Sequence, residues 1–208
     1  MRFVFSHMPK TGGTSVIASF RWAGLEVFKA SFAIAATPDA WIRGCRAEHG
    51  LFASRFLFME RRPASADVYF TWLRDPVDLL YSAFYWYRSH SPTRIYRPRA
   101  TGELLRRLVE RHSRVEGFVD DILEHRYRDA FPREWFRRMG LDGFDFVGIT
   151  ERMRESLSVF NARYGTALKA VHANAIGAPK QYRREEVREF LGAETEIYSR
   201  YAERSLDQ

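Results

Sequence analysis

The sequence predicts an α/β protein with a central parallel sheet, because short buried strands alternate with helical segments along the chain. Residues 2–6 (RFVFS) form an apolar strand pattern, and a glycine-rich turn and a helical apolar period over 14–22 follow it. Residues 68–73 (VYFTWL) are a continuous β-branched and aromatic run, which is typical of a strand buried in a parallel sheet. Residues 144–149 (FDFVGI) repeat that pattern. At this length we expect a single domain over residues 1–208.

Helix signals follow the second and third strands. Pro76 suits the first turn of a helix, Asp75 is placed to cap it, and residues 77–87 are apolar nearly all round. Thr150 is placed to cap a further helix over 151–164. We therefore expect helices to follow these strands directly.

In two other regions the sequence predicts helices and no strands. Residues 91–140 combine dense Arg with helical patterning, and we interpret about 90–140 as a helical insertion beside a cleft. Residues 184–204 predict a C-terminal helix or helix pair, and residues 169–183 between these elements predict a loop. The buried stripe expected in the C-terminal helices is Val187, Phe190, Leu191, Ile197 and Tyr198.

Composition excludes several classes of protein. With 46% hydrophobic residues, the chain has enough apolar side chains to offset the entropy of ordering, so disorder over its whole length is excluded. Cys45 is the single cysteine and cannot form an internal disulfide or a zinc cluster. No apolar run approaches the roughly 20 residues of a membrane span, and residues 1–8 lack the apolar core of a signal peptide. We expect a soluble protein that is not secreted.

The formal net charge of +7 has two interpretations. Arg accounts for 29 of the 33 basic residues, which a genomic preference for Arg over Lys would explain. An anionic partner, such as a phosphorylated cofactor, an acidic glycan or a nucleic acid, would also explain the charge. Charge alone does not choose between them, but no recognised nucleic-acid motif is present, so we expect no nucleic-acid partner.

The turn after the first strand has the parts of an oxyanion site. Its glycines let the backbone approach a ligand closely, and backbone amides converge there at a helix N-terminus that carries partial positive charge. Lysine adds a point charge and the hydroxyls add donors. A tight strand-to-helix turn with an exposed lysine is the alternative interpretation. The loop consists of Pro9, Lys10, Thr11, Gly12, Gly13, Thr14 and Ser15.

This loop is not a Walker A loop, in which the lysine follows the glycines. Here Lys10 precedes Gly12 and Gly13. The string His7-Met8-Pro9-Lys10-Thr11-Gly12-Gly13-Thr14-Ser15 instead resembles the 5′-phosphosulfate loop of sulfotransferases that use 3′-phosphoadenosine 5′-phosphosulfate (PAPS). It resembles the branch that contains heparan sulfate 2-O-sulfotransferase and its bacterial relatives.

A second string, Leu73-Arg74-Asp75-Pro76 with Ser82 eight residues after Arg74, resembles the family's 3′-phosphate motif. That motif implies that Arg74 and Ser82 bind the cofactor's 3′-phosphate. Relatives often carry a second Arg where this chain has Leu79, which puts a secondary contact in doubt. The alternative is that Arg74 and Asp75 form a local ion pair and Ser82 is a small packing residue.

Two later strings are also similar to this family, so the resemblance covers nearly the whole chain, although residues 90–140 match weakly. The first is Phe146–Glu151 with Glu155-Ser156-Leu157; its expected role is scaffold, with Glu151 supporting the site indirectly. The second is Val171–Asn174, followed by basic residues that the resemblance places as a lid over the 3′-phosphate. A solvated basic loop is the alternative for those residues, which are Lys180, Arg183 and Arg184.

Sulfuryl transfer to an alcohol needs a base and a positive site for the leaving phosphate. Lys10 is the expected cation, and no metal is required. His49 is the expected base, because residues 46–52 resemble a family stretch whose His is placed as the base, and a strand is expected at 55–59. Glu48 stands where relatives carry Gly, which puts the local backbone in doubt. Glu48, His7 and His172 are the other candidates; we expect His7 to be packed beside the loop.

The resemblance implies a P-loop-like (nucleoside-triphosphate-hydrolase-like) sulfotransferase fold with a helical acceptor-binding insertion. The implied activity is in-line transfer of the sulfuryl group from PAPS to a hydroxyl, with release of 3′,5′-adenosine bisphosphate. A carbohydrate is the expected acceptor and the bacterial cytoplasm the expected location. The Arg-rich segment fits an acidic glycan, and its aromatic residues could stack on sugars or pack in the core. These residues are Arg88, Arg94, Arg97, Arg99, Arg106 and Arg107, with Tyr85, Trp86, Tyr87 and Tyr96.

Three other functions stay open. The same chemistry could act on a tyrosine or a small-molecule alcohol, which only acceptor screening separates. A nucleotide kinase would bind ATP with Mg²⁺, and the missing Walker lysine disfavours it. A non-catalytic polyanion-binding protein would show steeply salt-dependent binding with no preference for a 3′-phosphate.

Overall fold

The computed structural model describes most of the chain, and the statements below concern the described residues. These are residues 1–30, 38–44, 50–54, 62–89, 100–127, 136, 140–171 and 182–204. The chain divides into two compact units. Unit 1 comprises Met1–Arg74, Arg138–Ala175 and Arg200–Gln208, and unit 2 comprises Asp75–Arg137 and Ile176–Ser199. A single domain can contain two such units, so the expectation of one domain stays a prediction.

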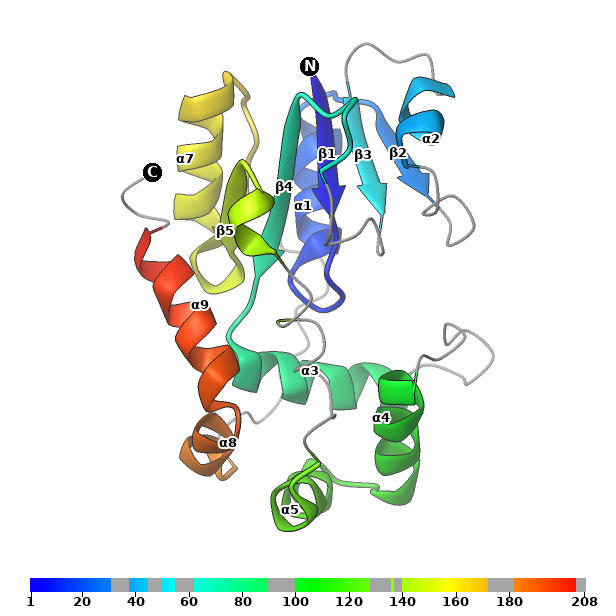
Figure 1. Ribbon diagram of the computed structural model, residues 1–208, viewed down its shortest axis with the longest axis vertical. Coiled ribbons are helices and arrows are strands. Elements are labelled where there is room, and N and C mark those ends of the chain that lie inside the picture. Colours follow the sequence, from blue (N-terminus) through cyan, green and yellow to red (C-terminus); the bar gives the residue numbers. More distant parts are fainter. Residues whose placement is uncertain are drawn as a thin grey trace. The chain divides into compact units, whose positions relative to one another are not determined.

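A five-stranded sheet forms the centre of unit 1 (Figure 1). Its strand order is β2-β3-β1-β4-β5, and all four strand pairs are parallel. The predicted α/β class with a central parallel sheet is therefore confirmed. The order is compatible with a P-loop-like fold. The strands are β1 (Arg2–Ser6), β2 (Val27–Ala30), β3 (Gly50–Ser54), β4 (Val68–Leu73) and β5 (Phe146–Ile149).

Helices cover both faces of this sheet, because alternate strand residues point to opposite faces and both sets are apolar. Helices α1 (Gly13–Trp22) and α7 (Met153–Tyr164) share a core with one face. Its aromatic rings pack closely, with Phe70 5.0 Å from Phe5 and 5.1 Å from Phe160 between ring centroids. On the other face, Ile42 of α2 (Pro38–Gly44) packs in a smaller core. Packing on both faces of the sheet therefore fixes the positions of the strand ends.

Unit 1 differs from the sequence predictions at β5 and at Thr150, and it contains β2, α2 and β3, which the sequence analysis did not predict. Strand β5 begins at Phe146 rather than 144, after the 3₁₀ turn η3 (Leu141–Gly143). A second 3₁₀ turn, η4 (Thr150–Arg152), precedes α7, and the Thr150 side chain caps neither element, so the predicted cap is wrong. The strand predicted at 55–59 lies outside the described residues, and β3 immediately precedes that segment.

Unit 2 is helical, as predicted for the insertion and the C-terminal segment. Asp75 caps α3 as predicted, since its Oδ1 accepts hydrogen bonds from the N–H groups of Val77 (2.8 Å) and Asp78 (3.1 Å). Phe84 and Phe118 pack with ring centroids 5.0 Å apart. Its helices are α3 (Pro76–Ser89), α4 (Ala100–Arg111), α5 (Val115–His125), α8 (Arg184–Phe190) and α9 (Gly192–Arg204), whose last residues belong to unit 1.

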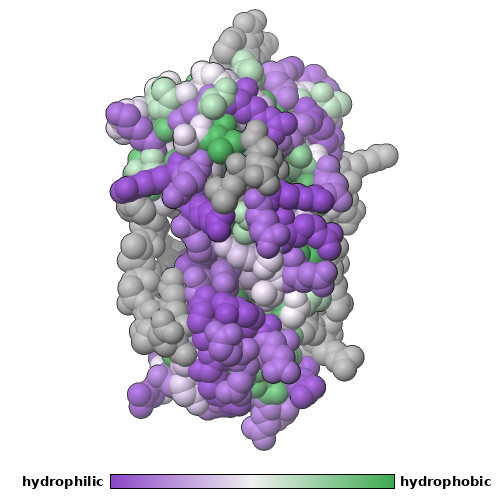
Figure 2. Space-filling model, turned by 90° about the vertical axis from the view of Figure 1, so that its left-hand side faces the viewer, coloured by the Kyte–Doolittle hydropathy of each residue, from purple (hydrophilic) through white to green (hydrophobic). Residues whose placement is uncertain are grey.

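The surface of the described residues is mainly hydrophilic, as Figure 2 shows for one face. Their large exposed hydrophobic side chains are Met1, Trp22 and Tyr182. Of the stripe predicted for the C-terminal helices, Val187 and Leu191 are buried, and the other members are half-buried. Within the described ranges, no helix is both long and apolar enough to span a membrane.

Candidate functional site

The glycine-rich loop lies at the carboxyl end of β1, the central strand of the sheet (Figure 1). From β1 the chain builds one half of the sheet (β2 and β3) and then the other half (β4 and β5). In open α/β sheets, ligands bind outside the carboxyl ends of strands where the strand order reverses in this way. Arg74 follows β4 and Thr150 follows β5, so both stand at the same edge as the loop.

Two loop residues have left-handed backbone conformations. Lys10 has φ 69° and Gly12 has φ 76°. Glycine adopts this region freely, but a lysine there costs on the order of 1 kcal/mol and is uncommon. Strained positions of this kind concentrate at binding sites, where turned backbone amides form anion-binding concavities. The Lys10 conformation is therefore an independent sign of a ligand loop.

Both glycines are required by their surroundings. A Cβ on Gly12 would lie 3.0 Å from the Met153 methyl group, in a left-handed backbone. A Cβ on Gly13 would lie only 2.0 Å from His7 Nε2. The His7 ring is buried and stacks on Phe5 with centroids 5.3 Å apart, so His7 is packed beside the loop as expected.

Side chains from neighbouring strands hold the loop carbonyls. Arg74 donates a hydrogen bond from Nη1 to the Lys10 carbonyl at 3.0 Å. The Thr150 hydroxyl lies 2.9 Å from the Thr11 carbonyl and 2.7 Å from that of Leu73. In a trans peptide the carbonyl and the following N–H point in opposite directions. The amides of Thr11 and Gly12 therefore point away from these donors.

The N-terminus of α1 adds further donors. Gly12 is its N-cap and makes no side-chain capping hydrogen bond, and the first turn contains no acidic residue. The amides of Gly13, Thr14 and Ser15 have no acceptor inside the helix, because the first turn never does. They carry the positive end of the helix dipole. Together with the loop amides they form a site suited to a phosphate or sulfate group.

Arg74 brings a charged side chain from the end of β4 to this loop. Its side chain is 17% exposed, and its Nε lies 3.8 Å from Glu151 Oε1, too far for a hydrogen bond. Among the described residues Nε has no hydrogen-bond acceptor although it is buried. A buried donor without an acceptor costs about 1–3 kcal/mol, which a ligand oxygen would offset. Arg74 therefore fits an anionic group.

The structure brings Pro9–Ser15 and Arg74 together in unit 1. Ser82 is half-buried on α3 in unit 2, so the predicted joint grip of Arg74 and Ser82 stays a prediction. Arg183 also belongs to unit 2 and pairs with carboxylates there. His49 and Lys180 lie outside the described residues, as does His172.

Sequence reasoning missed one residue of the site. Thr150 matched a helix cap by position, but its hydroxyl joins the loop to the end of β4. No local signal identifies this contact, because its partners lie 77 and 139 residues away in the chain.

The chain matches no protein-family model, and no curated protein matches it.

Proposed function

We propose that this protein binds PAPS and transfers its sulfuryl group to a hydroxyl group, with a carbohydrate as the acceptor. The observation that carries the proposal is the position of the loop 9–15 at the reversal point of the sheet, where Arg74 and Thr150 hold its carbonyls. The motif resemblance supports PAPS among phosphorylated ligands. When bound, PAPS would supply an activated sulfuryl group on a 5′-phosphate.

The loop residues would hold the 5′ end of the cofactor. The amides of residues 11–15 and the hydroxyls of Thr14 and Ser15 supply hydrogen-bond donors for nonbridging oxygens. Lys10 supplies a positive charge beside the leaving oxygen, which stabilises charge that develops during transfer. Because Gly12 and Gly13 are already locked by packing, these donors need little reorganisation.

Arg74 would recognise the phosphate group that distinguishes this cofactor from simpler nucleotides. One of its nitrogens is occupied by the Lys10 carbonyl, which fixes the guanidinium plane. The buried Nε is the donor that lacks an acceptor. In the proposal, Ser82 adds a hydroxyl to the 3′-phosphate, as the motif resemblance implies.

The proposal does not depend on His49 as the base. Gly50, the next residue, pairs with Arg2 at the amino edge of the sheet, whereas the loop follows the carboxyl end of β1. A five-residue strand separates these edges by about 16 Å. The proton acceptor is therefore best sought by substituting His49, His172 and Glu151 separately and measuring the transfer rate.

Calorimetric titration tests the proposal most directly. We expect 3′,5′-adenosine bisphosphate to bind wild-type protein at least tenfold more tightly than 5′-AMP, because the second phosphate adds charge-assisted hydrogen bonds. Arg74→Ala should weaken binding of the bisphosphate by about thirtyfold and leave 5′-AMP binding much less affected. Arg154→Ala, an exposed arginine on α7, is the matched control and should bind as the wild type does.

Three outcomes would contradict the proposal. Equal affinity for 5′-AMP and the bisphosphate would point to a general anion site. Tighter, Mg²⁺-dependent binding of ATP would favour a kinase. If the bisphosphate binds as expected, incubation with [³⁵S]PAPS and panels of glycans, tyrosine peptides and small alcohols identifies the acceptor, and no labelled product from any panel would argue against transfer to these acceptors.

A further inference from the structure

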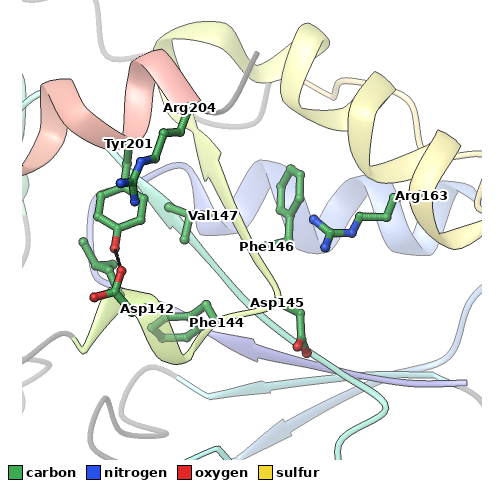
Figure 3. A pocket seen from close by; sticks show the side chains of 9 residues that line it. Asp142, Phe144, Asp145, Phe146, Val147, Arg163, Tyr201 and Arg204 are labelled. Atoms are coloured by element: carbon green, nitrogen blue, oxygen red, sulfur yellow. Dashed lines mark hydrogen bonds between the residues drawn. The ribbon is translucent and has the colours of Figure 1, made fainter. Parts of the chain in front are cut away.

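A pocket lies in unit 1 at the edge strand β5 (Figure 3). Its volume is about 310 Å³, which is at the lower end of the range for small-molecule sites. It is formed by η3, β5 and the two residues between them, together with one residue of α7 and two of α9. The residues that carry the argument below are Phe144, Val147, Arg163, Tyr201 and Arg204, with Asp142 and Asp145 at the rim.

This pocket is separate from the candidate cofactor site. It involves Phe144–Val147, at the amino end of β5, whereas Thr150 and the glycine-rich loop stand at the carboxyl end of the sheet. Because the strands are parallel, the two ends lie at opposite edges. The inference below therefore does not rest on the proposed transferase activity.

Both carboxylates of the pocket already have partners in the protein. Asp145 pairs with Arg62 through Oδ1, and its Oδ2 accepts a hydrogen bond from the Tyr69 N–H at 2.8 Å. Asp142 accepts a hydrogen bond from the Tyr201 hydroxyl at 2.6 Å. Burial and the Asp142 contact raise the pKa of Tyr201 to about 12, so the phenol stays a neutral donor.

The two arginines of the pocket have no such partners. Neither Arg163 nor Arg204 forms an ion pair with any described residue. Arg204 lies over the Tyr201 ring, 6.0 Å from its centroid, and Arg163 lies 5.7 Å from the centroid of Tyr164. Each therefore keeps a guanidinium fork that can bind a carboxylate, sulfate or phosphate group.

The rest of the lining is apolar. Phe144 stacks on Tyr69 with ring centroids 4.4 Å apart, which fixes its position at the pocket floor. Phe144 and the largely buried Val147 make the pocket apolar between the sides that carry Arg163 and Arg204 (Figure 3). A planar ring would contact this surface, and guanidinium planes also stack on rings.

We propose that this pocket binds a small aromatic anion, with Arg163 and Arg204 binding its anionic group and Phe144 and Val147 contacting its ring. The volume admits a single substituted ring and not an extended polymer. Loss of either arginine removes a charge-assisted hydrogen bond, which corresponds to a loss of affinity of about tenfold or more.

Protein-detected ¹H–¹⁵N NMR titration tests the proposal with three probes: phenyl phosphate, inorganic phosphate and benzyl alcohol. We expect phenyl phosphate to shift the amide resonances of residues 144–147 and 201–204. It should also bind more tightly than inorganic phosphate or benzyl alcohol. Arg163→Gln and Arg204→Gln should each weaken it about tenfold. Arg154 lies on the same helix as Arg163 but outside the pocket, so Arg154→Gln should leave the affinity for phenyl phosphate unchanged.

Saturating 3′,5′-adenosine bisphosphate separates this site from the loop. We expect phenyl phosphate still to shift residues 144–147 in its presence, and Lys10→Ala to leave that binding unchanged. Shifts confined to residues 10–15, or full displacement by the bisphosphate, would overturn the pocket proposal and leave the proposed function intact. Equal binding of inorganic phosphate, or no effect of either pocket substitution, would also overturn it.

Discussion

Arg74 in unit 1 is engaged differently from Arg183 and Arg184 in unit 2. In unit 2, Arg183 pairs with Asp120 at 2.8 Å and with Glu186, and Arg184 pairs with Asp78 at 2.6 Å and Asp75 at 3.2 Å. In unit 1, Arg74 donates instead to an uncharged backbone carbonyl and keeps a buried nitrogen without an acceptor. The same residue type joins helices in one unit and faces a ligand loop in the other.

The contrast shows why the net charge of +7 does not by itself locate a binding site. An arginine whose charge is already matched by carboxylates has little left to offer an anion. The pKa of Arg183 is raised by its hydrogen bonds to Glu186 and Asp120, so its charge is committed to those partners. To act as a lid over a cofactor, Arg183 would have to exchange both.

Close packing fixes the loop in unit 1 at Gly13. The substitution Gly13→Ala tests this packing and should have the largest effect on stability. The new methyl group would meet the His7 ring, so we expect the free energy of unfolding to fall by about 3 kcal/mol. Urea denaturation measures the loss. Gly143→Ala, where no atom lies within 4 Å, should change stability by less than about 0.5 kcal/mol. Equal losses of stability for Gly13→Ala and Gly143→Ala would contradict the role of packing in fixing the loop.

In unit 2 we expect a buried carboxylate to make a large contribution to stability. That contribution should depend on pH, whereas the packing of the loop should not. Asp121 accepts hydrogen bonds from His112 (2.6 Å) and Arg111 (3.1 Å). Burial alone would raise the pKa of Asp121, but these hydrogen bonds outweigh it and the pKa lies below its ordinary value. The stabilisation is therefore complete above the unfolded pKa of about 3.9 and is lost as the pH falls through the folded pKa.

Asp121→Asn should consequently lower the free energy of unfolding by about 2 kcal/mol at pH 7. Its stability should also fall less steeply than that of the wild type between pH 5 and pH 3. Denaturation curves across this range measure both effects, with Glu124→Gln on the exposed side of α5 as control. Parallel pH curves for the Asp121 variant and wild type would contradict the assignment.

Thr150→Val tests the neutral hydrogen bonds that hold the loop. The substitution keeps the shape and removes the hydroxyl next to the Thr11 and Leu73 carbonyls, so we expect a loss of about 1 kcal/mol in stability. Affinity for 3′,5′-adenosine bisphosphate should fall several-fold because the loop is less well fixed. Thr150→Ser should restore both properties. Failure of serine to rescue would indicate that packing, rather than the hydroxyl, is what matters.

Arg183→Gln gives the smallest expected effect. Its ion pairs are exposed, and exposed pairs contribute little to stability. If Arg183 serves only to pair with Asp120 and Glu186, calorimetry should show unchanged bisphosphate affinity. A loss as large as that of Arg74→Ala would break the contrast between the units and restore Arg183 to the cofactor site that the motif resemblance implies.

Much of the fold was predictable because strand and helix signals are local. The apolar runs at 2–6 and 68–73 and the cap at Asp75 lie where the structure has β1, β4 and the start of α3. The loop 9–15 was also recognisable, since its glycines and hydroxyl residues are contiguous. Predictions weakened where a residue had two compatible local roles, as Thr150 did.

The sequence by itself determined the α/β class, the strands β1 and β4, the start of α3 and the position of the glycine-rich turn, because each depends on neighbouring residues. Only the tertiary structure decided the strand order, the joining of Arg74 and Thr150 to the loop, and the pairing of each arginine. The contacts of Arg74 and Thr150 with the loop bring together residues 64 and 139 positions apart. They depend on which strands become neighbours, and that is settled by packing the whole sheet against its helices.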